Sequence, residues 1–453
     1  MIPAPSPGFL VEPIAVAGER LRRSLRVSAT RPVCGRIVEV KGPIARAAVS
    51  PVHIRELVSL RDARRGAIGL AEVIGFEGSH AVLAPFGAPQ GLSMRTEVVP
   101  LGRMLDLEVS PRMAGGVFDG LGQLMGRSAP SSLPDMAARR RLVRTPAPSP
   151  LSRRPISEPF STGIKAIDGL TTLGEGQRVA IIGSAGSGKS TLVTSLVRSA
   201  QADVVVMGLI GERGREVAET SARLAADKAM GRTIVIAATS DRPAVERMNA
   251  AFTATAVAEY FRDQGLKVLL VIDSVTRFAR AAREVGLSRG EPPGRRAFPP
   301  SVFDELPRLF ERAGAYANGS ITAAYTVLAE GEVEFDPLAE EVKALVDGHI
   351  VLSPEMAAAG RFPAIDALAS RSRVMDAVTD AEHRRCAHML RDLMARHRDI
   401  ELLLRVGEYK AGQDQATDRA VNAAGPIARF LAQDVSRPID LSETVAEMQR
   451  IVR

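Results

Sequence analysis

Residues 183–190 read Gly-Ser-Ala-Gly-Ser-Gly-Lys-Ser and match the pattern G-x-x-x-x-G-K-[ST] at every fixed position. An apolar run, Val179–Ile182, precedes this stretch, and a helical pattern, Thr191–Val197, follows it. Strand, glycine-rich loop and helix form the setting in which this pattern binds phosphate, because the glycines let backbone N–H groups face one anion. The positive end of the helix dipole adds to that attraction. The alternative is a flexible turn without a ligand, which the flanking strand and helix disfavour.

Two side chains of the loop add their own chemistry. The Lys189 ammonium can reach the terminal phosphates of a nucleotide, and the Ser190 hydroxyl can bind magnesium. We therefore predict nucleotide contacts along the loop and into the start of the helix, at Gly183, Ser184, Ala185, Gly186, Ser187, Gly188, Lys189, Ser190 and Thr191.

Length and composition bound the class of protein. The 453 residues exceed one ordinary core and predict two or three domains. Apolar residues make up 45% and charged residues 25%, as in soluble globular proteins, and no apolar run approaches the roughly 20 residues that span a bilayer. No secretory signal is evident. Cys34 and Cys386 lie far apart, so we expect reduced thiols and a cytoplasmic location.

The charge balance is basic, with a formal net charge of +7. That charge permits nucleic acid, anionic lipid or an acidic protein as partner and selects none of them. Aromatic residues are only 4%, which weakens a single-strand nucleic-acid interpretation. Residues 127–155, with Arg139–Arg141 among them, are interpreted as an irregular connecting loop, and a nucleic-acid patch without aromatic support is the alternative. The basic amphipathic stretch Glu19–Val27 is either a solvated arm or a helix that binds a partner or lipid.

The hydrophobic pattern changes along the chain. Short β-like runs between Cys34 and Gly102 predict a small barrel. From Phe160 to Val374 strand runs alternate with helical segments, which predicts an α/β fold whose mostly parallel sheet is covered on both faces. From Asp376 onward the pattern is helical. The predicted sheet strands are Val179–Ile182, Val204–Leu209, Thr233–Ala237, Val268–Ile272, Ile321–Leu328 and His349–Leu352.

Two of these strands end in carboxylates. Parallel strands bring their carboxyl ends to one edge, so we expect Asp273 to lie beside the phosphate loop and to hold magnesium. Glu212 follows another strand, where it could orient and polarise the attacking water. Arg213 could steady Glu212 or sense the phosphate. Without the phosphate loop, a surface Glu–Arg pair would be the preferred interpretation.

Longer motifs follow these carboxylates: Gly211–Val217, Ala238–Pro243, Asp273–Ala279, Gly290–Pro293, Pro299–Phe303 and Asp347–Ser353. They resemble the type III secretion ATPases, which include the injectisome and flagellar export ATPases and are similar to the catalytic subunit of rotary ATP synthases. The resemblance extends from about Cys34 to Val421. The sequence of Ala258–Gly265 favours the injectisome branch, and the flagellar export ATPase stays open as the alternative.

The resemblance implies a fold and an assembly. It predicts an N-terminal tail (1–30), a β-barrel domain (31–103), a RecA-like P-loop ATPase domain (104–375) and a C-terminal helical domain (376–453). It also implies a homohexameric ring that uses ATP and Mg²⁺ at sites between subunits. Because the rotary α subunits carry glutamine where Glu212 stands, Glu212 argues against a non-catalytic ring subunit. The lack of an aromatic-basic surface argues against a Rho-like RNA translocase.

The resemblance also implies roles for single residues. Glu212 falls on the catalytic glutamate, and Arg373 falls on the arginine that reaches into the neighbouring subunit's site. Phe362 stands where the family usually has a tyrosine against the adenine, and plain core packing is its alternative. Arg371 lies two positions before Arg373, so which arginine engages phosphate stays open. Pro354 departs from the family, which commonly has arginine there.

The resemblance finally implies partners. They are a stator protein at the N-terminal segment, a coiled-coil stalk in the ring pore, and chaperone–substrate complexes. It implies a cytoplasmic protein that couples ATP hydrolysis to chaperone release, unfolding and export of substrates, peripheral at the inner membrane.

Overall fold

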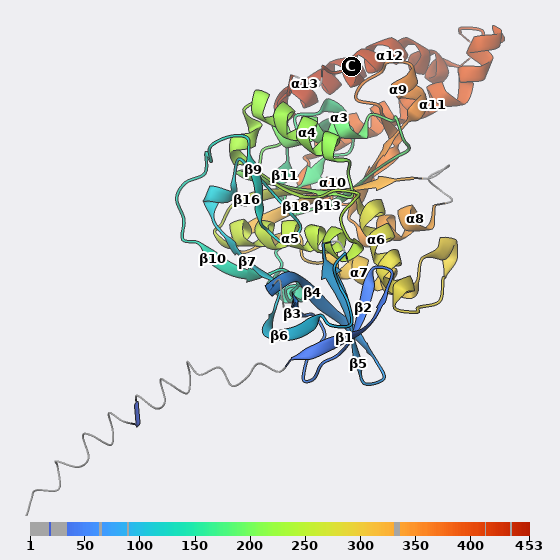
Figure 1. The fold of residues 1–453 in the computed structure, drawn as a ribbon. Coiled ribbons are helices and arrows are strands. Elements are labelled where there is room, and N and C mark those ends of the chain that lie inside the picture. The colour runs from blue at the N-terminus through green and yellow to red at the C-terminus, as the bar shows by residue number, and fades with distance from the viewer. Residues whose placement is uncertain are drawn as a thin grey trace, which may run out of the picture. The chain divides into compact units, whose positions relative to one another are not determined.

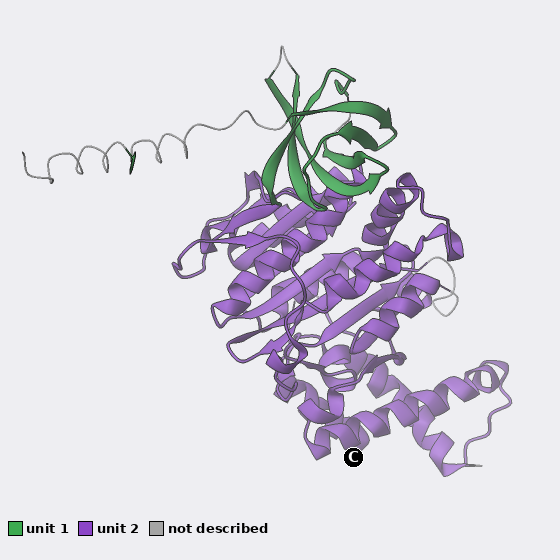
Figure 2. Ribbon diagram, turned by 90° about the horizontal axis from the view of Figure 1, so that it is seen from below, with its two compact units in different colours: residues 1–104 green, residues 105–453 purple. Residues whose placement is uncertain are grey.

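The computed structural model describes residues 18–19, 34–62, 66–87, 90–329, 336–412, 414–434 and 437–453. The chain forms two compact units, Met1–Met104 and Leu105–Arg453, which Figure 2 shows in separate colours. The predicted N-terminal tail, with its basic amphipathic stretch, lies almost wholly outside the described residues. The domain boundaries implied by the resemblance stay predictions, and here the helical C-terminal segment belongs to the larger unit.

The smaller unit is a closed barrel, as predicted. Its strands are hydrogen-bonded in the order β1-β2-β5-β4-β3-β6. Closure pairs every strand on both sides, and the interior is filled by aliphatic side chains such as Val58, Val73 and Leu83. The strands are β1 (Gly35–Lys41), β2 (Ile44–Ala48), β3 (Glu56–Asp62), β4 (Gly66–Glu77), β5 (His80–Phe86) and β6 (Glu97–Met104).

The larger unit is built on one long sheet with the strand order β20-β19-β13-β18-β16-β14-β15-β8-β9 (Figure 1). The strands from β19 to β8 pair in parallel, whereas β20, β9 and the short β17 pair antiparallel. This confirms the mostly parallel sheet. The strands are β8 (Gly116–Phe118), β9 (Leu124–Arg127), β13 (Arg178–Gly183), β14 (Val204–Ile210), β15 (Thr233–Ala238), β16 (Lys267–Asp273), β17 (Gly314–Tyr316), β18 (Gly319–Leu328), β19 (Gly348–Leu352) and β20 (Ile365–Ser372).

Helices cover both faces of this sheet (Figure 1). Successive residues of a strand point to opposite faces, and the two cores divide accordingly. Ile182 packs in the core beneath α5, α6 and α7, whereas Ile181 packs in the core beneath α3 and α4. These helices are α3 (Lys189–Ser199), α4 (Gly214–Ala226), α5 (Ala244–Asp263), α6 (Val275–Ser288) and α7 (Pro300–Phe310).

Helix α5 lies very close to the sheet because small residues face each other. A Cβ added to Gly208 of β14 would lie 3.3 Å from the Cβ of Ala254 and 2.9 Å from Cδ1 of Ile272. The closeness of the two backbones therefore depends on the absence of a side chain at Gly208.

The C-terminal segment is helical, as predicted. Helix α11 (Ala381–Val406) begins at Asp380, whose carboxylate accepts the backbone N–H of His383, and ends at Gly407 in the left-handed conformation. It packs with α12 (Gln415–Leu431), α13 (Leu441–Val452) and the short α2 (Lys165–Leu170) around an apolar cluster that includes Phe430.

Short elements connect these parts. The remaining strands and α-helices are β7 (Asp106–Val109), β10 (Arg139–Leu142), β11 (Pro159–Phe160), β12 (Leu173–Gly174), α8 (Pro337–Leu345), α9 (Pro354–Ala358) and α10 (Met375–Val378). The single-turn 3₁₀ helices are η2 (Pro111–Met113), η3 (Pro150–Ser152), η4 (Ala229–Arg232) and η5 (Arg295–Ala297). No helix among the described residues has the length and apolarity needed to cross a membrane.

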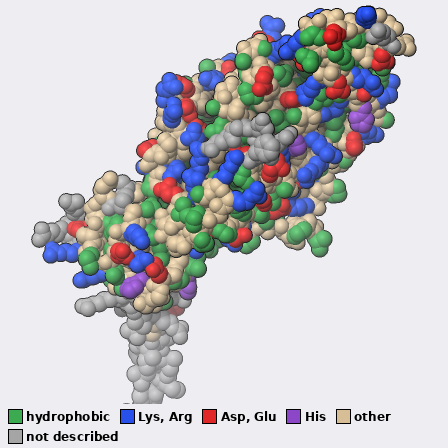
Figure 3. Space-filling view, turned by 90° about the vertical axis from the view of Figure 1, so that its right-hand side faces the viewer, with side chains coloured by type: hydrophobic (Ala, Val, Ile, Leu, Met, Phe, Trp, Pro, Cys, Tyr) green, Lys and Arg blue, Asp and Glu red, His purple; other side chains and the backbone are tan. Residues whose placement is uncertain are grey.

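The arginine-rich stretch 127–155 is not wholly irregular, which corrects the sequence interpretation. Arg139–Leu142 form β10, which pairs antiparallel with β7. Arg140 pairs with Asp106 at 3.0 Å, and Arg141 pairs with Asp263. These ion pairs bind β10 to other elements of the larger unit. On the face that Figure 3 shows, Lys and Arg side chains lie among Asp and Glu side chains, which does not favour a nucleic-acid surface.

Candidate nucleotide site

The glycine-rich loop turns from β13 into α3. Gly186 and Gly188 have φ angles of 80° and 84°, a left-handed conformation that glycine adopts without steric cost. The Ser187 hydroxyl donates a hydrogen bond to the Ser184 carbonyl oxygen at 2.8 Å and closes the turn. Gly188 is the N-cap of α3, so the helix begins at Lys189. The loop thus has the strand–loop–helix setting that the sequence predicted.

The loop forms one wall of a cleft of about 630 Å³. Strand ends, one side of α4 and the first turn of α6 form the other walls, since parallel strands end at the same edge of the sheet. The structure brings most of the predicted site residues into this cleft: Ser184, Ala185, Gly186, Gly188, Lys189, Ser190, Thr191, Glu212, Asp273 and Phe362. Gly183, Ser187, Arg213 and Arg373 do not line it.

Asp273 ends β16 directly opposite the loop. Its Oδ1 atom lies 3.1 Å from the Lys189 ammonium and accepts a hydrogen bond from the Thr326 hydroxyl at 2.6 Å. The carboxylate is almost fully buried, with 6% of the residue exposed. Lys189 and Asp273 therefore compensate each other's charge at the floor of the cleft.

Glu212 lies two residues beyond the end of β14 and is buried. Burial raises its pKa to about 8, with further contributions from a hydrogen bond to the Glu216 side chain and from the charge of Asp273. The positive charges of Arg277 and Lys189 oppose that rise. The hydrogen bond to Glu212 in turn lowers the pKa of Glu216. A carboxyl group with a pKa near neutrality is suited to accept a proton.

Arg277 of α6 is the residue that holds Glu212. Its Nε lies 3.0 Å from one Glu212 carboxylate oxygen, and its Nη1 donates to the Gly211 carbonyl oxygen at 2.7 Å. From the sequence, Arg213 was expected either to steady Glu212 or to sense the phosphate; its side chain is 73% exposed, and its Nε atom lies 4.0 Å from a Glu216 carboxylate oxygen. Arg277 was missed as a site residue because it follows a different strand, although it stands in the first turn after Asp273.

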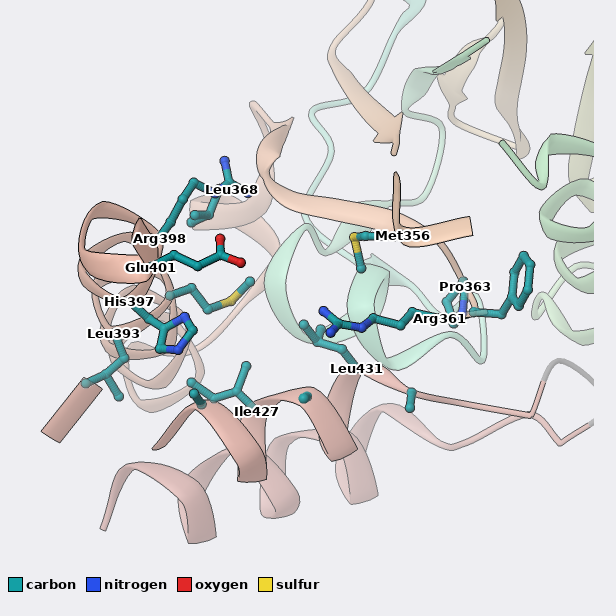
Figure 4. A pocket seen from close by; sticks show the side chains of 15 residues that line it. Met356, Arg361, Pro363, Leu368, Leu393, His397, Arg398, Glu401, Ile427 and Leu431 are labelled. Carbon is teal, nitrogen blue, oxygen red and sulfur yellow. The ribbon is translucent and has the colours of Figure 1, made fainter. Parts of the chain in front are cut away.

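Phe362 lies against the loop. Its Cε1 would be 3.2 Å from a Cβ added to Gly188, and 39% of the residue is exposed. The same residue also borders a second, mostly apolar pocket of about 440 Å³ between β20, α11 and α12. Figure 4 shows Met356, Leu393, Ile427 and Leu431 around that pocket. Phe362 is thus shared by a polar cleft and an apolar pocket.

Arg371 and Arg373 lie elsewhere, at the end of the edge strand β20. Both are exposed, and neither lines the cleft of its own chain. The Arg373 backbone N–H donates to the Asp347 carbonyl oxygen at 2.8 Å, and its guanidinium donates to the Lys343 carbonyl oxygen at 3.2 Å. β20 ends at Ser372, so Arg373 follows the strand directly.

The cleft offers oxygen donors of the kind that magnesium prefers. The Ser190 hydroxyl and the Asp273 carboxylate both line it. Lys189 and Thr326 both contact the Oδ1 atom of Asp273. The described residues contain no cluster of three or more His, Cys, Asp or Glu side chains suited to a metal. This fits magnesium, which commonly binds through one or two protein oxygens, water and phosphate.

Family models match three successive parts of the chain. The ATP synthase alpha/beta family nucleotide-binding domain matches residues 163–372, and the beta-barrel domain of that family matches residues 33–102. The T3SS EscN ATPase C-terminal domain matches residues 379–450. A type 3 secretion system ATPase of Sinorhizobium fredii is 49% identical over 93% of both chains. A flagellum-specific ATP synthase of Bacillus subtilis is 38% identical over 93% of this chain and 94% of its own length.

Solved structures agree with these matches. The assembled ATPase EscN of the enteropathogenic E. coli type III secretion system has a TM-score of 0.85 and 42% identity, covering 92% of this chain and all of its own. EscN in complex with its central stalk EscO has a TM-score of 0.83 and 41% identity, with the same coverage. The fold and the order of the parts are therefore those of the structures compared.

Proposed function

The chain belongs to the type 3 secretion system ATPases, and from that premise we propose that the cleft beside residues 183–190 is the site where it hydrolyses ATP for protein export. One observation supports this site: Lys189, Asp273 and Glu212, whose pKa is raised to about 8, all line one cleft. These are the groups that phosphoryl transfer to water requires.

The loop and Lys189 would hold the phosphates, and Ser190 and Asp273 would hold magnesium. When bound, magnesium neutralises negative charge on the phosphate oxygens. Thr326 fixes the Asp273 carboxylate through its hydroxyl. Each of these side chains lies at the end of a strand or the start of a helix, so the site rests on rigid elements.

Glu212 would orient the attacking water and accept its proton. Arg277 holds both the Glu212 carboxylate and the preceding Gly211 carbonyl group, which fixes the direction in which the carboxylate points. A proton taken by Glu212 would rest on a group whose pKa burial already raises.

Phe362 would receive the nucleotide base. Its ring lies against Gly188 of the phosphate loop, and the residue also borders the apolar pocket of Met356, Leu393, Ile427 and Leu431. A purine is flat and mostly apolar on its faces, so stacking on the ring suits it. The same ring without a tyrosine hydroxyl can serve this role.

Arg373 would complete the site of a neighbouring subunit. It is exposed and lies outside its own cleft, and the related EscN forms an assembled ATPase. A guanidinium supplied in trans stabilises charge on the transferring phosphoryl group. We propose a homohexameric ring on this basis, with a central stalk like the one that EscN binds.

The wider setting is proposed from the family alone. It comprises a stator at the N-terminal segment, chaperone–substrate complexes, and a cytoplasmic position against the inner membrane. The net charge of +7 supports attraction to anionic lipid. Flotation with anionic liposomes tests the membrane part, and protein that stays at the bottom of the gradient removes it. An injectisome is favoured over a flagellar system because the secretion ATPase shows higher identity, 49% against 38%.

The decisive experiment replaces Glu212 with glutamine, which keeps the shape and removes the base. We expect ATP turnover to fall by about 10²–10⁴-fold while nucleotide binding persists. Glu219→Gln is the matched control, because Glu219 lines the same cleft but is exposed and pairs with Arg215. Glu212→Gln turnover equal to that of the control would refute the assignment.

A further inference from the structure

The edge strand β20 contains a large bulge just before the two arginines. His349 of β19 pairs with Arg371, and Val351, two residues on, pairs with Asp366. The intervening residues 367–370 therefore loop out of the ladder. Bulges of this kind re-aim the side chains that follow them. Here the side chains that follow are those of Arg371 and Arg373.

The bulge is closed by its own hydrogen bonds. The Asp366 carboxylate accepts the backbone N–H groups of Leu368 and Ala369 at 2.9 and 3.0 Å. The Ser370 hydroxyl donates to the Asp366 carbonyl oxygen at 2.6 Å and accepts the Val351 N–H at 2.9 Å. Asp366 is thus the hub on which the shape of the bulge depends.

Helix α11 holds the same bulge from outside the sheet. The Arg398 guanidinium donates to both carboxylate oxygens of Asp366, at 2.9 and 3.1 Å. About two turns towards the start of the helix, Arg391 donates to the Ser370 carbonyl oxygen at 3.1 Å. Both ends of the bulge are therefore bonded to one helix.

The path from the bulge to the arginines is short and stiff. Arg371 follows Ser370 directly and pairs with His349, whose imidazole bonds to the Ala369 carbonyl oxygen at 3.1 Å. Ser372 and Arg373 then continue along β19 and reach the Asp347 carbonyl oxygen. A shift of the bulge would therefore be passed to the arginine side chains.

We infer that Arg398 and Arg391 of α11 are positioning residues for the arginine supplied to the neighbouring subunit. This inference rests on the proposed function of Arg373. Arg398 acts on the hub itself, and its side chain is 54% exposed, so removing it costs little folding stability. Its effect should therefore be seen in catalysis rather than in unfolding.

The main variant is Arg398→Met in the assembled full chain, which keeps the side-chain stem and removes the guanidinium. We expect kcat to fall by about tenfold to hundredfold, because small misplacements of a catalytic group have effects of that size. The KM for ATP and the thermal midpoint should stay unchanged. Arg398→Lys should recover part of the rate. Arg396→Met is the control, because Arg396 pairs with Asp392 on its own helix.

A double-mutant cycle separates positioning from a general structural effect. Arg398→Met is combined with Arg373→Lys, which keeps a cation and a measurable rate. If Arg398 acts through Arg373, the second substitution should add little further loss of kcat. Multiplied losses both in this cycle and in the matching cycle with Arg371→Ala would overturn the inference, as would wild-type turnover of Arg398→Met. Wild-type turnover of Arg373→Lys and Arg373→Ala alone would instead refute the proposed role of Arg373.

The same cycle with Arg371→Ala decides which arginine is positioned. If Arg398→Met couples strongly with Arg371→Ala and not with Arg373→Lys, the arginine supplied to the neighbouring subunit is Arg371. Helix α11 would then position Arg371 in place of Arg373. A lowered thermal midpoint in Arg398→Met that accounts for the rate loss would count against the inference. Arg391→Met is a second variant at the other end of the bulge, and its thermal midpoint must be measured as well, because Arg391 also donates to the Leu170 carbonyl oxygen at 2.7 and 3.2 Å.

Discussion

Arg312 is the largest fully buried side chain of the larger unit. Its guanidinium makes two hydrogen bonds to the Glu259 carboxylate, at 2.8 and 2.6 Å, and a third to the Val143 carbonyl oxygen at 2.7 Å. This pair joins α5 to the segment after α7. A buried charge is tolerated only when a partner compensates it, so each member depends on the other.

We expect Arg312→Met to lower the free energy of unfolding by about 3–5 kcal/mol, because it leaves the Glu259 carboxylate buried and uncompensated. Urea unfolding of the nucleotide-free protein measures this. Arg312→Met/Glu259→Leu should recover much of the loss. Arg405→Met is the control, since Arg405 is 74% exposed and pairs with Glu401 on the surface. Equal midpoints for the Arg312 and Arg405 variants would contradict the prediction.

The raised pKa of Glu212 predicts a pH dependence. Glu212 must be ionised to accept a proton, and burial raises its pKa to about 8. We therefore expect kcat/KM for ATP to rise with pH through neutrality and to level off above the pKa. Replacing Glu216 with glutamine removes the anionic acceptor that favours protonated Glu212 and supplies an amide N–H that can donate to the ionised carboxylate, so the rise should move to lower pH. A profile that is flat from pH 6 to pH 9 would argue against Glu212 as the base.

At the scale of elements, the packing of α5 on β14 depends on Gly208. We expect Gly208→Val to destabilise the fold by about 1–3 kcal/mol, because its side chain would overlap Ile272 and crowd Ala254. Thermal unfolding measures the shift. Gly126→Val is the control, since a Cβ on this strand glycine meets nothing within 4 Å. Similar midpoints for the two variants would show that α5 can move away from the sheet without cost.

Elements with a strong local pattern could be predicted from the sequence. The long apolar strands, the loop at residues 183–190 and the C-terminal helices all follow from residues close in the chain. The end of β16 put Asp273 beside the loop because parallel strands share one edge. The barrel followed from short alternating runs.

Elements that depend on contacts between residues far apart in the chain could not be predicted from the sequence. Strand β20 was missed because its bulge breaks the alternation on which strand prediction depends. Strand β10 reads as a run of arginines, and only its pairing with β7 makes it a strand. The contact between Arg277 and Glu212 joins residues on different elements, so no short sequence pattern predicts it. The loop, in contrast, needs only its own glycines.

At the scale of the whole molecule, the proposed ring makes activity depend on concentration. If Arg373 completes a neighbour's site, dilution that dissociates the ring should lower the specific ATPase activity. Mixing inactive Glu212→Gln with inactive Arg373→Ala should restore part of the activity, because some interfaces then combine an intact glutamate with an intact arginine. Sedimentation in parallel gives the state of assembly. A specific activity that is constant across dissociation would show that each chain acts alone.

The ion pair between Lys189 and Asp273 also bears on how substrate enters. A triphosphate that binds Lys189 alone leaves the buried Asp273 carboxylate without a counter-charge. A metal that binds Asp273 alone leaves the Lys189 ammonium without one. Only the metal–nucleotide complex offers both groups a new counterpart at once. Lys189 and Asp273 can therefore separate without leaving an uncompensated charge only when phosphate and metal arrive together. We expect the cleft to bind the magnesium complex of ATP far more readily than metal-free ATP.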